Sequence, residues 1–168
     1  IFQNDADTDG SYHWDDNDGF INNCLQAGMT PVVTVGANEG LKGGSYDESL
    51  LRLKQYVVQL VQRYAGKGVV WEGFNESFYK WLDQAMDYDP QDMVTVTNIL
   101  GKAIRQYDSQ ALFIAGAFSS NADYISDKDE YLNWGRYMES SFNDGLLTYA
   151  NALSHHPYQV NTKPEALL

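Results

Sequence analysis

The chain has 168 residues, and its 23 acidic against 11 basic side chains give a net charge of −12. This charge argues against nucleic acid as a partner, because phosphates would be repelled, and no apolar run is long enough to span a membrane. A hydrophobic content of 43% over this length favours one globular domain, covering residues 1–168. Since the chain begins with Ile and shows no signal peptide, we expect a processed product or a fragment.

An acidic stretch near the start has the spacing of a calcium-binding loop. Closely spaced carboxylates converge on a hard cation, and a glycine permits the sharp turn between them. The candidate ligands are Asp5, Asp7, Asp9, Ser11 and Asp16. The last of these stands where the pattern has a bidentate Glu, and only four residues precede the loop, too few for an entering helix. Two interpretations stay open, a solvated acidic loop with no cofactor and a calcium site.

The first predicted helix covers residues 15–27. Asp15 or Asp16 is expected to cap it, and Gly28 to end it. Cys24 lies on its apolar stripe and is the only cysteine. We therefore expect it to pack as a small hydrophobe, and no internal disulfide can form.

A buried strand is predicted at residues 31–35, followed by a glycine-rich loop. This loop carries Asn38, which would reach a ligand from the end of the strand. A second helix should begin at the capping box formed by Ser45 and Glu48 and end at Gly66, with apolar side chains at helical spacing between them.

The next strand, residues 69–76, ends in Asn75 and Glu76, an amide and a carboxylate side by side. A polar pair at the C-terminal end of a buried strand occupies the usual place of catalytic groups in α/β barrels. Strand alternation puts Glu72 on the same face as Glu76, where a carboxylate needs a hydrogen-bonding or cationic partner. Trp81 follows in a loop that would form a wall of the same cleft.

Two further helix–strand units complete the chain. Asp89 and Pro90 should open a helix, followed by a strand at residues 112–118. The polar run 119–129 is expected to be a loop, and residues 131–142 a helix with its aromatic residues in the core.

The last predicted strand covers residues 151–158. His156 and Tyr158 share one face and His155 takes the other, so the two histidines form a poor metal site. Helices and strands thus alternate from end to end, which is typical of a parallel α/β sheet.

The residues WEGFNE at 71–76 resemble the strand-four motif of clan A glycoside hydrolases, Trp-Glu-x-x-Asn-Glu. Together with His-Pro-Tyr at 156–158, they are most similar to family 39 and its relatives. Phe74 stands where Trp is usual, Ser77 where Pro is usual, and Asn151 replaces an Asp.

The resemblance implies a (β/α)8 barrel, of which this chain would supply about strands two to six. It makes Glu76 the general acid/base, places Asn75 on the sugar 2-hydroxyl, and lines the cleft with His156 and Tyr158. The family's nucleophile, a Glu on strand seven, lies outside this pattern of strands. We therefore expect a partial TIM barrel, a fragment of a retaining β-glycosidase that is inactive alone.

Open sheet edges would then favour self-association or a complementing fragment as partner, besides a saccharide substrate. An acidic, cysteine-poor carbohydrase is compatible with an extracellular location. Two other functions stay open: a non-catalytic carbohydrate-binding module, and a calcium-stabilised structural or interaction domain. A flavodoxin-like open sheet is the alternative fold, although the sequence has no phosphate-binding loop to favour it.

Overall fold

The computed structural model describes residues 11–36, 45–75, 90–121 and 128–158. Helices and strands alternate through these ranges, as the sequence predicts. The elements in chain order are α1 (Asp15–Gln26), β1 (Val32–Val35), α2 (Tyr46–Tyr64), β2 (Val70–Gly73), α3 (Pro90–Tyr107), β3 (Phe113–Asn121), α4 (Lys128–Asn143) and β4 (Ala152–Tyr158).

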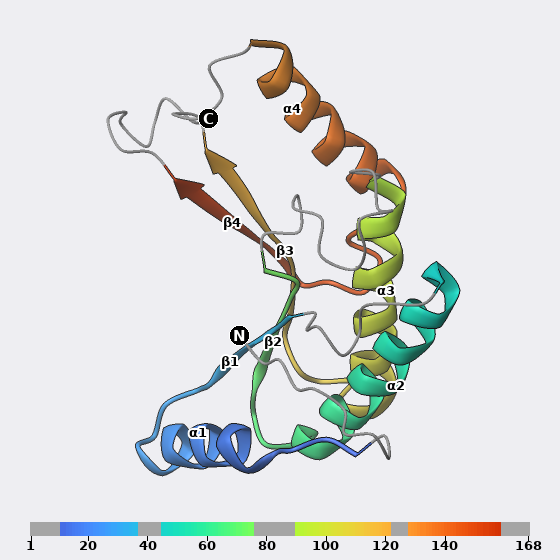
Figure 1. Ribbon diagram of the computed structural model, residues 1–168. Helices are drawn as coiled ribbons and strands as arrows, with labels where there is room; N and C mark the ends of the chain where they lie inside the picture. The colour runs from blue at the N-terminus through green and yellow to red at the C-terminus, as the bar shows by residue number, and fades with distance from the viewer. Residues whose placement is uncertain (1–10, 37–44, 76–89, 122–127, 159–168) are drawn as a thin grey trace.

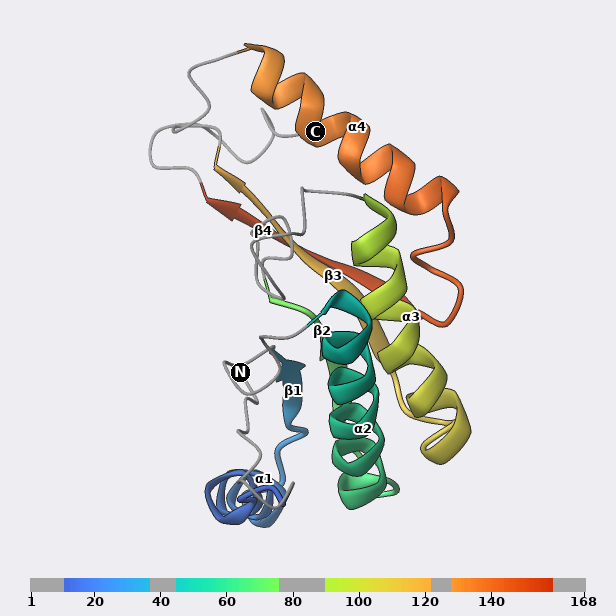
Figure 2. The ribbon, with the colours of Figure 1, turned by 45° about the vertical axis from the view of Figure 1, so that its right-hand side comes forward.

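The four strands form one parallel sheet in the order β1-β2-β3-β4, so each strand pairs with its neighbours in the sequence. Helices α2, α3 and α4 all lie on one side of this sheet (Figures 1 and 2). A flavodoxin-like sheet would reverse its strand order and carry helices on both faces. The sheet order and the single helical layer therefore exclude that alternative and agree with a segment of a barrel.

The core lies between the sheet and the helical layer. Val33, Trp71 and Phe113 stand in register on the three successive strands and are completely buried. The opposite face of the sheet is more open, with Val32 50% exposed and Glu72 half-buried. The alternation expected from period-two strands thus separates a helix-covered face from a helix-free face.

Helix α2 has the ends that its sequence predicts. The Ser45 hydroxyl accepts from the Glu48 backbone N–H at 3.3 Å, and the Ser45 N–H donates to the Glu48 carboxylate at 2.6 Å. This reciprocal pair gives a hydrogen-bond acceptor to two backbone N–H groups, those of Ser45 and Glu48, that would otherwise lack a partner at the start of the helix. The helix then ends at Tyr64, two residues before Gly66.

The expected cap of α1 is wrong. Trp14, not Asp15 or Asp16, is the N-cap, and no side chain caps this end. The acidic residues instead occupy the first turn, where negative charge favours the positive end of the helix dipole. The other end is as predicted, because Gly28 adopts a φ of 71° and its N–H donates to the Leu25 carbonyl.

An aromatic cluster and an ion pair attach the start of the described chain to α2. The rings of Tyr12 and Trp14 lie 5.3 and 6.2 Å from that of Tyr56. Arg63 pairs with Asp18 of α1, and its Nε donates to that carboxylate at 2.8 Å. The hydrogen bond from Arg63 lowers the pKa of Asp18. The segment that follows the acidic loop is therefore fixed against α2.

The expected loop at residues 119–129 is wrong at both ends. Strand β3 continues to Asn121, with Ser119 paired to His156, and α4 already begins at Lys128. The register shifts between Gly116 and Phe118, and Gly116 has a φ of 100°. Such a bulge bends a strand and increases its twist.

None of the helices in the described ranges is long and apolar enough to cross a membrane.

Candidate active site

The strand ends bring several of the predicted site residues to one edge of the sheet. Asn75 lies in the turn that directly follows β2 and is half-buried. The residue before it, Phe74, is completely buried and holds this turn against the protein interior. Glu76, Asn38 and Trp81 lie outside the described residues. The structure therefore fixes the position of Asn75 in the chain's architecture and describes no contact of these three.

His156 lies near the end of β4. The register joins Glu72 to Ile114 and Ile114 to Ala152, so these three side chains stand on the helix-free face. His156 follows Ala152 by four residues on the same face and is half-buried. Tyr158 has the same parity at the last position of the strand, but its side chain lies outside the described ones.

His155 points to the other side of β4, next to Phe118 in the register. Burial, with a smaller contribution from the neighbouring His156, lowers the pKa of His155. Both histidines lie within β4, where adjacent residues alternate between the two faces.

Asn75 and His156 lie at nearly the same level of the sheet. Asn75 is three residues beyond Glu72, and His156 is four residues beyond Ala152, which stands in register with Glu72 through Ile114. β3 lies between their strands, and β2 is paired with β3 only at Trp71 and Glu72, before it ends at Gly73.

Deeper on the same face, Glu72 has the partner that its inward position requires. The Thr34 hydroxyl of β1 donates to the Glu72 carboxylate at 2.5 Å, and the two residues stand side by side in the register. A hydrogen bond of this kind compensates a half-buried carboxylate for lost water. The sequence contains one indication of this pair, since Thr34 is the polar residue in the otherwise apolar strand VVTV.

A metal site finds no support among the described residues. They contain no group of three or more His, Cys, Asp or Glu side chains that could hold an ion. Of the predicted calcium ligands, Ser11 and Asp16 are exposed, and the latter lies in the first turn of α1. Asp5, Asp7 and Asp9 lie outside the described residues, so the calcium loop stays a prediction.

The architecture defines the class of protein: a parallel sheet in sequence order with one helical layer is part of a TIM barrel. Comparison with solved structures agrees. The chain is similar to a GH10 xylanase from Thermobacillus composti, a TIM-barrel enzyme, with a TM-score of 0.58 and 15% sequence identity. The match covers 88% of this chain and 44% of the xylanase chain, so the chain spans less than half the length of that enzyme. At this identity the likeness concerns the fold.

No family model matches the chain, and no curated protein matches it.

Proposed function

We propose that the chain is part of a retaining β-glycosidase related to family 39 of clan A, with Glu76 as its general acid/base. One observation supports this proposal: Asn75 lies in the turn after β2, two residues beyond Gly73, at the C-terminal edge of a parallel sheet, and Glu76 is the next residue in the sequence. Catalytic groups of TIM-barrel enzymes come from this edge. The likeness to a glycoside hydrolase fold supports the same class of reaction.

In this proposal the reaction is a double displacement. Glu76 protonates the glycosidic oxygen of the leaving group, while a second carboxylate attacks the anomeric carbon and forms a glycosyl-enzyme. Glu76 then takes a proton from the water that hydrolyses this intermediate. The two carboxyl groups of such enzymes lie about 5–5.5 Å apart. The second one would come from a strand beyond those of this chain.

The other residues bind the sugar. Asn75 would hydrogen-bond the 2-hydroxyl next to the reacting carbon. This hydrogen bond strengthens as charge develops in the transition state. His156 and Tyr158 would line the cleft from β4, and Asn38 and Trp81 from the loops after β1 and β2. Glu72 would keep its hydrogen bond to Thr34 below them and support the site without reacting.

Covering the helix-free face is part of the same proposal. Val32 is 50% exposed there, although it belongs to a strand whose other face is fully buried. We expect further strands to complete the sheet, from a longer protein, a complementing fragment or a second copy of the chain. Without them the chain alone would bind a saccharide weakly and turn nothing over.

Leaving-group dependence tests the role of Glu76. Aryl β-glycosides with poor leaving groups need protonation, whereas those with good leaving groups do not. Glu76→Gln should therefore lower the hydrolysis of poor-leaving-group substrates by about 10²- to 10⁴-fold and that of good ones far less at the glycosylation step. Glu139→Gln, the same change at an exposed position of α4, is the matched control.

The outcomes are distinct. An equal loss of hydrolysis rate for all substrates in the Glu76→Gln variant, or no loss, would show that Glu76 is not the general acid. Saccharide binding without any hydrolysis in the completed protein would favour a carbohydrate-binding module instead. The intact mass of the purified protein, compared with 19.0 kDa for these residues, shows whether the assay is made on the chain alone.

A further inference from the structure

The sheet ends in two edge strands whose outer sides are open. Within residues 11–36, 45–75, 90–121 and 128–158, β1 pairs only with β2, and β4 pairs only with β3. All four strands run parallel, so the open edges of β1 and β4 have the same direction. An open edge presents backbone N–H and C=O groups to any strand that can lie beside it.

The proline of β4 leaves its open edge intact. The Asn151 N–H donates to the Phe113 carbonyl at 2.7 Å, so the backbone groups of odd-numbered residues along β4 face β3. Pro157 is one of these residues, and the donor that it lacks is therefore missing on the side of β3. The backbone groups of Ala152 and Ser154 face outward, where a further strand could bond to them.

The edge of β1 has the same arrangement. The Val70 N–H donates to the Pro31 carbonyl at 3.0 Å, so this proline also faces the paired side, and the backbone groups of Val32 and Thr34 face outward. Neither β1, with the sequence VVTV, nor β4, with ALSHHPY, contains an Asp, Glu, Lys or Arg side chain. Such charges commonly protect edge strands from pairing. Both edges are therefore able to accept a partner strand.

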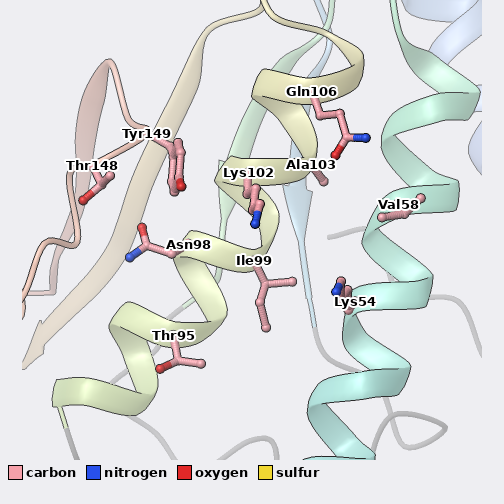
Figure 3. A pocket seen from close by; sticks show the side chains of 10 residues that line it. All are labelled: Lys54, Val58, Thr95, Asn98, Ile99, Lys102, Ala103, Gln106, Thr148 and Tyr149. Atoms are coloured by element: carbon pink, nitrogen blue, oxygen red, sulfur yellow. The ribbon is translucent and has the colours of Figure 1, made fainter.

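The helical layer is closed in its middle and open beside β4. Val58 of α2 and Ile99 of α3 point into the space between these two helices (Figure 3). Beside β4, Leu153 lies on the helix-covered face of the sheet, because its parity is opposite to that of Ala152. It is nevertheless 39% exposed. A further helix on that face would bury this side chain.

Helix α1 has an apolar surface that matches this need. Only Ile21 of α1 is buried, whereas Phe20 and Leu25 are 50% and 36% exposed. Helices α2, α3 and α4 each join two paired strands, but in the described ranges no strand precedes α1. The helix of a parallel crossover lies over the strands that flank it. We therefore expect α1 to cover β1 and whichever strand pairs with its open edge.

We propose that two copies of this chain pair through these edges and close an eight-stranded barrel. The strand β4 of each copy lies parallel to β1 of the other, and a two-fold axis along the barrel relates the copies. The described ranges contain four strands and four helices, and twice this number gives the eight of each that form a TIM barrel. In this dimer α1 of one copy covers Leu153 of the other.

Closure turns the helix-free face into the interior of the barrel. Val32, which is 50% exposed on that face, becomes buried there, and Glu72 lies below the completed cleft. The partner copy thus supplies the wall that the four strands of one copy leave open. The assembly does not depend on the role of Glu76, so a failed leaving-group test would leave it standing.

Sedimentation velocity of the full 168-residue chain tests the assembly. Across about a hundredfold range of concentration, we expect the mass to rise from the 19.0 kDa of one copy to twice that value and to stop there. Each copy carries a net charge of −12, and salt screens the repulsion between them, so added NaCl should strengthen the dimer. A monomer under all these conditions would overturn the proposal. Growth beyond two copies would also overturn it, because unlike edges that do not close into a ring form open filaments.

A pair of matched replacements locates the interface. Leu153→Lys introduces a charge where α1 of the other copy would pack, and it should weaken the dimer by about tenfold or more. Leu51→Lys makes the same change at a leucine that is 56% exposed on α2, away from both edge strands, and should leave the dimer unchanged. Equal weakening by the two variants would reduce the association to general apolar attraction and overturn the proposal.

Ala152→Pro tests the strand pairing itself. It removes a backbone donor from the open edge of β4 and none from the side that faces β3, so it should weaken the dimer by about tenfold or more. Far-UV circular dichroism and the urea midpoint of the dilute protein show whether the fold is kept. A folded variant that dimerises as strongly as the parent would refute pairing at this edge.

Discussion

Replacement of Gly101 by Ala tests the packing of α3 against the segment before β4. In an exposed helix interior this change stabilises by about 1 kcal/mol, because Gly loses more backbone entropy than Ala on folding. At Gly101 the new Cβ would lie 2.6 Å from the Tyr149 Cβ and 2.9 Å from the Phe113 Cε1. Both contacts are far shorter than van der Waals separation, so something must move.

Neither neighbour can move without cost. Phe113 is completely buried in the core, and the Tyr149 carbonyl is held by two hydrogen bonds from Arg105. Overpacking of such a site costs about 1–3 kcal/mol, which exceeds the helix gain. We expect Gly101→Ala to lower the free energy of unfolding by about 1–2 kcal/mol.

Gly19 provides the matched control. It also lies inside a helix, α1, but it is exposed and a Cβ there would meet no atom within 4 Å. Gly19→Ala should therefore raise the free energy of unfolding by about 0.5–1 kcal/mol. The same chemical change has opposite signs at the two sites, since only one of them is closely packed.

Urea unfolding of the three proteins, with comparison of midpoints and m-values, measures both effects. In thermal melts of the same proteins, each kcal/mol should shift the Tm by about 2–4 °C in a chain of this size. A Gly101→Ala variant as stable as the parent would refute the close approach of Tyr149 to α3.

Three further changes have expected outcomes. Ser45→Ala removes the capping box of α2 and should cost about 1 kcal/mol in urea unfolding; an unchanged midpoint would mean that the first turn is held by tertiary packing alone. Arg105→Met removes hydrogen bonds to the carbonyls of Ser109, Ala111 and Tyr149. We expect it to lower the free energy of unfolding by about 2–4 kcal/mol. Arg105→Lys should recover only part of this loss, because its ammonium lacks the planar fork of the guanidinium. Burial lowers the pKa of His155, so the folded state favours the neutral ring: its contribution to stability is present above the ordinary histidine pKa of about 6.5 and is lost as the pH falls through the lowered value. Thermal melts of His155→Gln between about pH 7 and 5 should show a weaker pH dependence than the parent, and an unchanged slope would contradict this assignment.

The sequence predicts best what is decided by neighbouring residues. The limits of α2 follow from Ser45, Glu48 and Gly66, which act within one or two turns of the helix ends. The apolar run predicts β2 itself, although the strand ends at Gly73 and not at residue 76 as expected. These features depend on local backbone hydrogen bonds and on alternation, so they can be predicted without knowledge of the fold.

Contacts between distant segments could not be predicted in the same way. Thr34 and Glu72 are 38 residues apart, and only the parallel register brings them together. The polar run that begins at Ser119 is typical of a loop, yet it continues β3 because β4 offers its backbone a partner. The close packing of Gly101 against Tyr149 joins α3 to the segment before β4, and no single stretch of sequence contains that information.

The two ends of the sheet carry different kinds of polar residue. Where the strands begin, two side chains each accept one backbone and one side-chain hydrogen bond: Asp108 accepts from the Gly66 N–H and the Trp71 Nε1, and Asn151 accepts from the Phe113 N–H and the Arg105 guanidinium. These contacts join the loops and strands at that end, as expected where a barrel is stabilised rather than active.

At the other end of the sheet, Asn75 lies in the turn after β2 and His156 lies near the end of β4. If stability and chemistry are divided between the ends in this way, changes at the two ends should separate in experiment. Arg105→Met should lower the unfolding free energy and leave the leaving-group dependence of hydrolysis in the completed protein unaltered. In the proposed role of Glu76, Glu76→Gln should change the leaving-group dependence and leave the unfolding free energy unaltered, because catalytic residues are seldom selected for stability. A loss of leaving-group dependence in the Arg105 variant would show that the two ends are coupled.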